Sequence, residues 1–369
     1  NENRMTYSAR LIQTLLVFQL LAANPIHLEK LFIPKINCQD INNNGIPDFM
    51  ATNNSLAPRT LYHVEINNSN IEFLWEYTMS KNISGYFSDM ILGDFDNNNQ
   101  LELISSAYQD DKPEIFYVFS VDSLGSYDNS PRIMGFHNVK VDVIHPQKLY
   151  TLSKNENNTQ LFVLTQGSPN RKVIMCEYLD DKINFVGSLG KKFLNKSLGP
   201  LSISTGNFNE DSVEDIFILN NGINPNGYFI FSDGSNKEVS LKNYPHLKLL
   251  HKKGMDINFD EIDDLLLINE YGELMSDAWN SQPISFLDSN VNNFSLNLNN
   301  GLININTISK NGKIGQHVID PLTKSILTSD YVTPNFSKED SSNINSLITS
   351  DHIFLVNNNE LYSFLLDNN

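Results

Sequence analysis

A pattern of about 50 residues that recurs along the chain constrains its fold more than any other feature. Each copy contains an acidic or Asn-rich turn, a short apolar strand, a second turn of Gly, Asn or Pro, and a second strand. The copies occupy residues 40–66, 94–121, 153–179, 207–231 and 256–275, and the turn of the third copy is degraded. Two hairpins without an acidic turn follow at residues 302–319 and 353–366.

These seven hairpins predict a series of small antiparallel sheets. Their first strands start, in steps of 37 to 58 residues, near Phe49, Leu103, Leu161, Ile216, Leu265, Leu302 and Ile353, and the sixth, after the shortest step, is the least regular. Each repeat has room for about four short strands, and no segment carries a long helical period.

A four-stranded sheet cannot bury both of its faces alone, whereas sheets arranged radially bury them against one another. We therefore predict an all-β fold, a seven-bladed β-propeller of four-stranded antiparallel blades. An early strand within residues 27–36 is expected to complete the last blade.

The N-terminal segment, residues 1–26, differs from the repeats. Arg10 directly precedes an apolar run that is too short to span a bilayer but suits a secretory signal. Gln13 and Gln19 lie inside this run, so the alternative is an N-terminal helix packed against the domain. We predict a signal peptide or helix over residues 1–26, a single propeller domain over 27–369, no transmembrane segment, and a secreted, cell-surface or periplasmic location.

The acidic turns share one register of oxygen donors. Counted from the first polar residue of each turn, side chains with oxygen stand at places 1, 3, 5 and 9, and the backbone carbonyl of place 7 can join them. Oxygen cages of this kind suit a calcium ion with a structural role. The predicted ligands are Asp40, Asn42, Asn44, Ile46 and Asp48; Asp94, Asp96, Asn98, Gln100 and Glu102; Asn207, Asn209, Asp211, Val213 and Asp215; and Asp256, Asn258, Asp260, Ile262 and Asp264.

The charge of each turn ranks the four predicted sites. The Asp94 and Asp256 turns each hold three carboxylates, and the other two hold two. Carboxylates about 4 Å apart repel by about 4 kcal/mol per pair at an effective dielectric constant near 20, so the two richer turns should bind a divalent ion most tightly. The degraded turn has Ser153, Asn155, Asn157 and Leu161 at these places and is expected to hold no metal.

Two alternatives to a calcium loop of this type exist. Asn and Asp are common turn formers, so a solvated hairpin corner explains any one of these turns without a metal. Four turns in the same register are harder to explain in that way. An EF-hand needs flanking helices, whereas apolar strands such as residues 101–105 follow these turns at once.

The turns and their flanks resemble the FG-GAP or VCBS-type repeats of integrin alpha-subunit propellers and of many secreted bacterial proteins. The matching segments are GYFSDMILGDFDNNNQLEL, residues 85–103, and more loosely STGNFNEDSVEDIFIL, residues 204–219. The resemblance implies structural calcium in the outer loops of the blades. At place 6 the family has glycine, which only Gly45 keeps; Asn99, Ser212 and Glu261 replace it.

Composition narrows the function. Hydrophobic residues form 40% of the chain and charged residues 19%, which is enough apolar material for a packed core. The net charge of -17 repels phosphate backbones and anionic lipids, so it disfavours membrane surfaces as partners, and we predict no nucleic-acid partner. Cys38 and Cys176 are too few for a disulfide framework, and a buried, unpaired Cys176 is expected.

No motif of a serine hydrolase, zinc protease, dithiol enzyme or phosphate-binding loop occurs in the sequence. We therefore predict a monomeric, non-catalytic module for binding, adhesion or scaffolding, with a protein or glycan ligand on one face of the propeller. One alternative is a hydrolase or lyase with its site at the central channel. Another is a structural segment of a longer adhesin.

Overall fold

The computed structural model contains strands and turns, and the residues that it describes contain no helix. No membrane-crossing helix is therefore found among them. The described residues are 26–27, 31–32, 40–42, 44–46, 48–53, 59–67, 70–80, 85–109, 113–140, 144–153, 160–167, 171–189, 201–220, 225–241, 247–249, 254–269, 273–276, 284–285, 291–299, 301–309, 313–332, 344–348, 352–357 and 360–365. The predicted signal peptide or helix lies almost entirely outside them.

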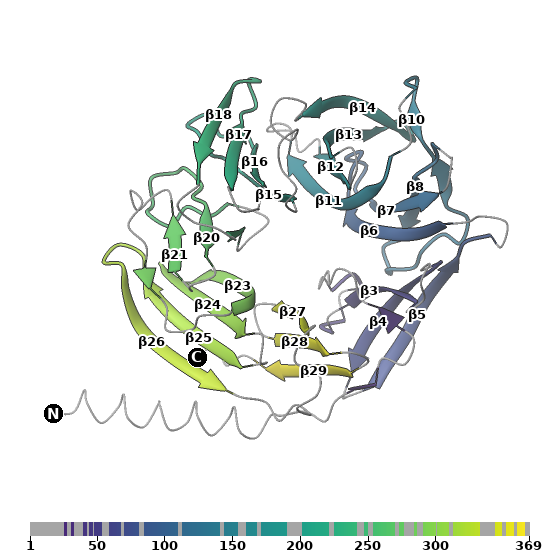
Figure 1. Cartoon of the computed structure of the whole chain (residues 1–369). Helices are drawn as coiled ribbons and strands as arrows, with labels where there is room; N and C mark the ends of the chain where they lie inside the picture. Colours follow the sequence, from purple (N-terminus) through teal and green to yellow (C-terminus); the bar gives the residue numbers. More distant parts are fainter. Residues whose placement is uncertain are drawn as a thin grey trace. The chain divides into compact units, whose positions relative to one another are not determined.

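Five of the sheets contain four strands that are consecutive in the chain, and the first four of these contain β2–β22 apart from β10–β14 (Figure 1). They are β2 (Leu31–Phe32), β3 (Asp48–Asn53), β4 (Thr60–Asn67) and β5 (Asn70–Thr78); β6 (Gly85–Gly93), β7 (Leu101–Gln109), β8 (Phe116–Val121) and β9 (Arg132–Met134); β15 (Leu201–Gly206), β16 (Asp215–Asn220), β17 (Asn226–Ile230) and β18 (Asn236–Ser240); and β19 (Lys248–Leu249), β20 (Leu266–Ile268), β21 (Glu273–Ser276) and β22 (Ile284–Ser285).

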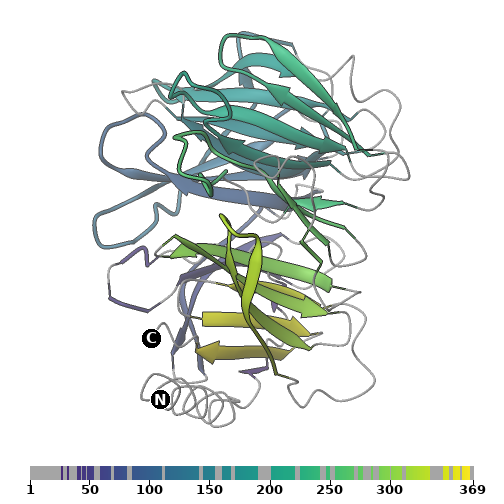
Figure 2. The same ribbon diagram turned by 90° about the vertical axis from the view of Figure 1, so that its left-hand side faces the viewer.

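Three further sheets complete the described strands. One contains β23 (Val291–Asn299), β24 (Leu302–Ser309), β25 (Ile314–Asp320) and β26 (Ser325–Val332). The next joins β27 (Ile344–Ile348), β28 (His352–Asn357) and β29 (Glu360–Leu365) to β1 (Ile26–His27). The last has five strands: β10 (Phe136–His137), β11 (Pro146–Ser153), β12 (Gln160–Gln166), β13 (Val173–Leu179) and β14 (Lys182–Leu189). The sheets are twisted, as Figures 1 and 2 show.

The all-β prediction is confirmed. The hairpins that the sequence identified all have the same place within their sheets. The first strand of each lies second from one edge of its sheet: β3, β7, β12, β16, β20, β24 and β28. The acidic turns therefore connect the first and second strands. The expected pairing of an early strand is also present, because β1 pairs antiparallel with β29, although the neighbouring β2 pairs with β3 instead.

The sheet that contains β10 departs from the four antiparallel strands that the sequence predicts. After β9 the chain crosses to the outer edge of the next sheet, where β10 pairs in parallel with β14. Gly135 lies at the crossing, and a Cβ atom there would stand 2.7 Å from the carbonyl oxygen of Pro113. Phe136 then packs edge-on against Phe116 and Phe185, which anchors the fifth strand.

The chain divides into two compact units. The central unit comprises Lys30–Asn67 and Ile71–Asn269, and the terminal unit comprises Asn1–Glu29, Asn68–Asn70 and Glu270–Asn369. In the terminal unit, His317 is buried on β25 and lies 2.7 Å from Ser329 Oγ of β26. The single domain predicted over residues 27–369 stays a prediction.

In the central unit, consecutive sheets pack face to face. Three buried apolar clusters each combine side chains from two neighbouring sheets: β2–β5 with β6–β9, β6–β9 with β10–β14, and β10–β14 with β15–β18. Because both faces of a middle strand are covered, β16 is buried at all six positions and does not alternate between apolar and polar residues. Cys176 is a buried free thiol in the second of these clusters, as expected.

Hydrogen bonds connect the edge strands β6, β11 and β15 of these sheets. The buried carboxylate of Asp89, on β6, accepts a hydrogen bond from the backbone N–H of Leu149 on β11, at 2.7 Å. On β15, Thr205 Oγ1 donates to the carbonyl oxygen of Thr151 on β11, at 3.3 Å. The sheets of the central unit are thus held by apolar packing and by directional bonds together.

Phe95 provides a test of this packing. Its ring is fully buried in the cluster between the β6–β9 and β10–β14 sheets, 6.3 Å from the ring of Phe162. We expect Phe95→Ala to lower the free energy of unfolding by about 3–5 kcal/mol, measured by urea unfolding, because it leaves a cavity. At Phe259, which is 56% exposed, the same substitution should cost less than about 0.5 kcal/mol. Equal losses at the two positions would contradict the packing described here.

Candidate metal centre

One hydrogen bond recurs in all four acidic turns. The residue at place 9 carries a buried carboxylate, which accepts a hydrogen bond from the backbone N–H of place 2. The pairs are Asp48 with Ile41, Glu102 with Phe95 at 2.9 Å, Asp215 with Phe208 at 3.1 Å, and Asp264 with Ile257 at 3.0 Å. This bond closes each turn and holds the place-2 side chain under it.

The other oxygen donors fold the turn around themselves. In three turns, both oxygens of the place-1 aspartate accept hydrogen bonds from the N–H groups of places 5 and 6, at 2.7–3.1 Å. The place-5 side chain accepts a bond from the N–H of place 7 in all four turns, that is, from Ile46, Gln100, Val213 and Ile262. These are Asx-type bonds, which Asp and Asn form readily in turns.

The backbone at place 6 is left-handed in every turn. The φ angles are 82° at Gly45, 63° at Asn99, 59° at Ser212 and 70° at Glu261. Non-glycine residues adopt this conformation at some energetic cost, which is smallest for Asn. The backbone of the turn therefore does not depend on a glycine at this place.

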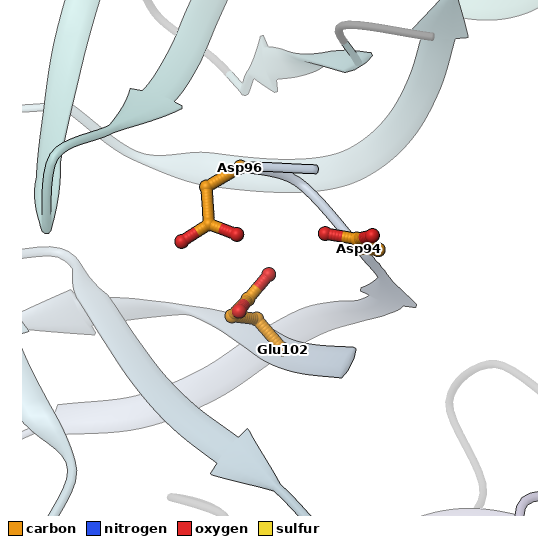
Figure 3. A group of neighbouring side chains, drawn as sticks. All are labelled: Asp94, Asp96 and Glu102. Carbon is orange, nitrogen blue, oxygen red and sulfur yellow. The ribbon is translucent and has the colours of Figure 1, made fainter. Parts of the chain in front are cut away.

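The Asp94 turn, between β6 and β7, brings three carboxyl groups together. One oxygen each from Asp94, Asp96 and Glu102 lies within 4.8 Å of the other two, and Figure 3 shows the carboxyl groups pointing toward one another. Among the described residues, this is the one group of three or more His, Cys, Asp or Glu side chains that is this close. Asn98 is exposed at the rim, and its Nδ2 donates to Asp96 Oδ2 at 3.0 Å.

The surroundings of the Glu102 carboxyl disfavour its charged form. Burial raises its pKa to about 7, and repulsion by Asp96 and Asp94 adds to the rise. The hydrogen bond from Phe95 and the positive charge of Arg132 act in the opposite direction. A cation among the three carboxylates would remove this repulsion.

The Asp94 cluster fits a calcium ion. Calcium binds oxygen at about 2.3–2.6 Å, so two oxygens up to about 4.8 Å apart can share one ion. All three groups are hard oxygen donors, and neither sulfur nor imidazole is among them. Asp94, Asp96 and Glu102 would hold the ion, together with Asn98 and the carbonyl of Gln100.

The Asp40 turn is arranged differently, because side chains of β4 enter it. Asp48 Oδ1 lies 2.7 Å from Nε2 of the buried His63, and its other oxygen accepts the bond from Ile41. Glu65 is also buried, and its Oε1 accepts hydrogen bonds from Asn42 Nδ2 at 2.6 Å and Asn44 Nδ2 at 2.8 Å. Both oxygens of Asp48 thus already have partners.

Sequence reasoning missed His63 and Glu65. They occupy alternate positions of β4, and Glu65 lies directly opposite Asp48 in the register of β3 and β4. Two ionisable residues on one face of an otherwise apolar strand were the available signal.

The Asn207 turn has fewer carboxylates at the predicted places than the Asp94 turn. Asn207 Oδ1 is buried and accepts no hydrogen bond among the described residues, so it is an oxygen that a cation would satisfy. Ser232 Oγ donates to Asp211 Oδ2 at 2.6 Å. Burial raises the pKa of Asp215 to about 6, although the N–H groups of Ser232 and Phe208 bond to it.

The Asp256 turn, between β19 and β20, keeps the backbone bonds but not the charge cluster. Asp256 accepts from the N–H groups of Asp260 and Glu261, and Asp264 accepts from Ile257. Its three carboxylates are not brought within 4.8 Å of one another. The Asn258 side chain instead donates to Asp260, at 3.0 Å.

Residues at place 8 link neighbouring turns. Asp263 Oδ2 accepts a hydrogen bond from the N–H of Asn207, at 2.8 Å, and Glu214 accepts one from the N–H of Ser153. The degraded turn that begins at Ser153 is thus bonded to the next sheet. Its Asn155 and Asn157 lie outside the described residues.

The raised pKa of Glu102 predicts a pH dependence in metal-free protein. Between its ordinary pKa of 4.5 and about 7, the folded chain keeps a proton that the unfolded chain has lost. The free energy of unfolding should therefore fall as the pH rises through this window. Urea unfolding with a chelator present should show this fall, and Glu102→Gln should weaken it.

The matched control is Glu72→Gln, which removes an exposed carboxylate from β5. It should leave the pH dependence as in the unmodified chain. A dependence of equal size in Glu102→Gln would contradict the electrostatic description of this carboxyl.

Comparisons with known proteins define the fold. No family model matches the chain, and no curated protein does. Solved structures are similar at low identity. A chain of the crystal structure of BBS1N in complex with ARL6DN is 9% identical, with a TM-score of 0.55 over 94% of this chain and 97% of the other. The Dos1 propeller is 8% identical, with a TM-score of 0.53 over 90% and 78%. A chain of the Mitotic Checkpoint Complex is 9% identical, with a TM-score of 0.50 over 93% and 95%. Similarity at such low identity indicates the fold alone. The shared fold is a β-propeller.

Proposed function

We propose that this protein is a calcium-stabilised β-propeller that acts as a non-catalytic binding or scaffold module, secreted or exposed at a cell surface. The observation that carries the calcium part is the convergence of Asp94, Asp96 and Glu102 on one point. Glu102 is buried and Asp94 and Asp96 are half-buried, and like charges brought together in such a place are costly unless a cation compensates them. The resemblance of residues 85–103 to FG-GAP repeats supports the same ion.

We further propose seven blades. The seven hairpins of the sequence each supply the strand that lies second from one edge of a sheet, which is the regularity that a radial repeat requires. The pairing of β1 with β29 supports closure, because it joins the first described strand to the last. Closure of this kind protects a terminal blade from fraying.

The binding role is supported by similar propeller chains that occur in protein complexes. Two of the similar chains belong to assemblies, BBS1N with ARL6DN and the Mitotic Checkpoint Complex. Propellers present many loops on a rigid frame, and loops on such frames commonly carry recognition. We propose a protein partner for this chain and keep a glycan as the alternative ligand.

The rival proposal is a hydrolase or lyase with a site at the central channel. Such a site needs accessible acid and base groups. His63 and His317 are both buried and bonded to neighbouring side chains, which favours structural roles for them. The Asp94 cluster lies in a turn between strands, where an ion would brace the sheet.

Calcium should raise the melting temperature of the purified chain. An ion present at about 100 times its dissociation constant adds about 2.7 kcal/mol to the free energy of unfolding, which raises the melting temperature of a chain of this size by a few degrees. Differential scanning fluorimetry with calcium and with EDTA measures this shift. Asp96→Asn should reduce it, and Glu72→Gln should leave it unchanged.

A melting temperature that is the same in calcium and in EDTA would remove the ion from the proposal. It would leave the binding role open, since that role depends on surface loops.

The partner is to be identified with protein and glycan arrays probed with the calcium-loaded chain. We expect protein hits that survive competition with a glycan mixture. Turnover of an array glycan, detected by mass spectrometry, would favour the lyase or hydrolase instead.

A further inference from the structure

An arginine lies beside the Asp94 cluster and belongs to the same sheet. Arg132 is on β9, and its Nη2 donates a hydrogen bond to Ser120 Oγ on β8, at 3.1 Å. Ser120 lies directly opposite Glu102 in the register of β7 and β8. The guanidinium is therefore held within electrostatic range of the cluster, and its charge lowers the pKa of Glu102.

The same guanidinium also reaches the neighbouring sheet. Its Nη1 forms an ion pair with Asp181, in the turn between β13 and β14. Tyr178 Oη donates to the same Asp181 oxygen at 2.9 Å, and Arg132 Cζ lies 5.6 Å from the centre of the Tyr178 ring. Asp180 and Asp181 both have left-handed backbones, with φ of 51° and 58°, so the tight turn directs Asp181 toward Arg132.

A fixed cation near a cation site has two opposite effects. In the metal-free protein it offsets the mutual repulsion of the carboxylates, which keeps the turn folded. In the loaded protein it repels the ion, by more than it would repel a monovalent charge, since calcium carries two charges. Both effects act through the charge of Arg132 and weaken as salt screens it.

We propose that Arg132 sets the affinity of the Asp94 site for calcium, lowering it while replacing part of the missing positive charge in the metal-free state. The inference rests on the proposed function of that site. Asp181 moderates the effect, because it neutralises Arg132 from the neighbouring sheet. The calcium affinity of the site thereby depends on the contact between the β6–β9 and β10–β14 sheets.

Isothermal titration with calcium at low salt tests the proposal in the full chain. Arg132→Gln should bind calcium about three- to tenfold more tightly, the size expected for one partly screened charge acting on a divalent ion. Arg59→Gln is the matched control, since it makes the same charge change just before β4, on another sheet, and should leave the dissociation constant unchanged. The difference between the two variants should shrink at high salt.

Two further variants separate charge from packing. Arg132→Lys keeps the charge, so its dissociation constant should stay within about twofold of the unmodified chain. Asp181 is 67% exposed, so Asp181→Asn is expected to fold normally, and it should weaken calcium binding. These two variants test the proposal even if Arg132→Gln does not fold.

The outcomes are distinct. If the unmodified chain binds calcium and Arg132→Gln binds it no more tightly than Arg59→Gln, the role of Arg132 is overturned and the calcium site stands. If Arg132→Lys binds as tightly as Arg132→Gln, packing rather than charge is responsible, and the role of Arg132 is again overturned. If the unmodified chain binds no calcium, both the site and this inference fail.

Discussion

The buried carboxylate at the start of a second strand is the constraint on which the acidic turns depend. Asp48, Glu102, Asp215 and Asp264 are each at most 5% exposed, and each must be bonded because an unpaired buried carboxylate is costly. The bond comes from the N–H of place 2, seven residues earlier, which forces the chain to turn back on itself. The polar turn and the apolar core are in this way parts of one arrangement.

The same bond links the candidate metal centre to the packing of the sheets. Phe95 donates its N–H to Glu102 while its ring lies in the cluster that joins two sheets. A change in the charge around Glu102 therefore acts directly on an apolar contact between sheets. This provides a physical reason for an ion in the turn to stabilise the fold, since Phe95 is bonded to the turn and packed between the two sheets.

Partners from outside the turn distinguish four turns that share one pattern. His63 and Glu65 enter the Asp40 turn from β4, and Ser232 enters the Asn207 turn. Counting carboxylates ranked the Asp256 turn beside the Asp94 turn, yet three carboxylates converge only in the Asp94 turn among the described residues. Such partners are distant in sequence, and their arrival depends on strand register, which periodicity does not specify for a particular pair of side chains.

Much of the fold and of the turn geometry was open to prediction because it is local. The order of turn and strand predicted the strand that lies second from one edge of each sheet, and the residues at place 6 have the left-handed backbone that a glycine-like place implies. The crossing of β10 to the next sheet was not predicted, since it depends on a close approach at Gly135 and on aromatic contacts of Phe136 across two sheets.

The all-β class, the positions of the repeating strands and the oxygen-rich turns follow from the order of residues along the chain, because hydrophobic period and turn chemistry act over a few residues. Which carboxylates converge, which are already bonded, and the place of Arg132 between one cluster and the next sheet depend on the folded chain. Charges interact through space, so their effects depend on which strands and sheets become neighbours after folding.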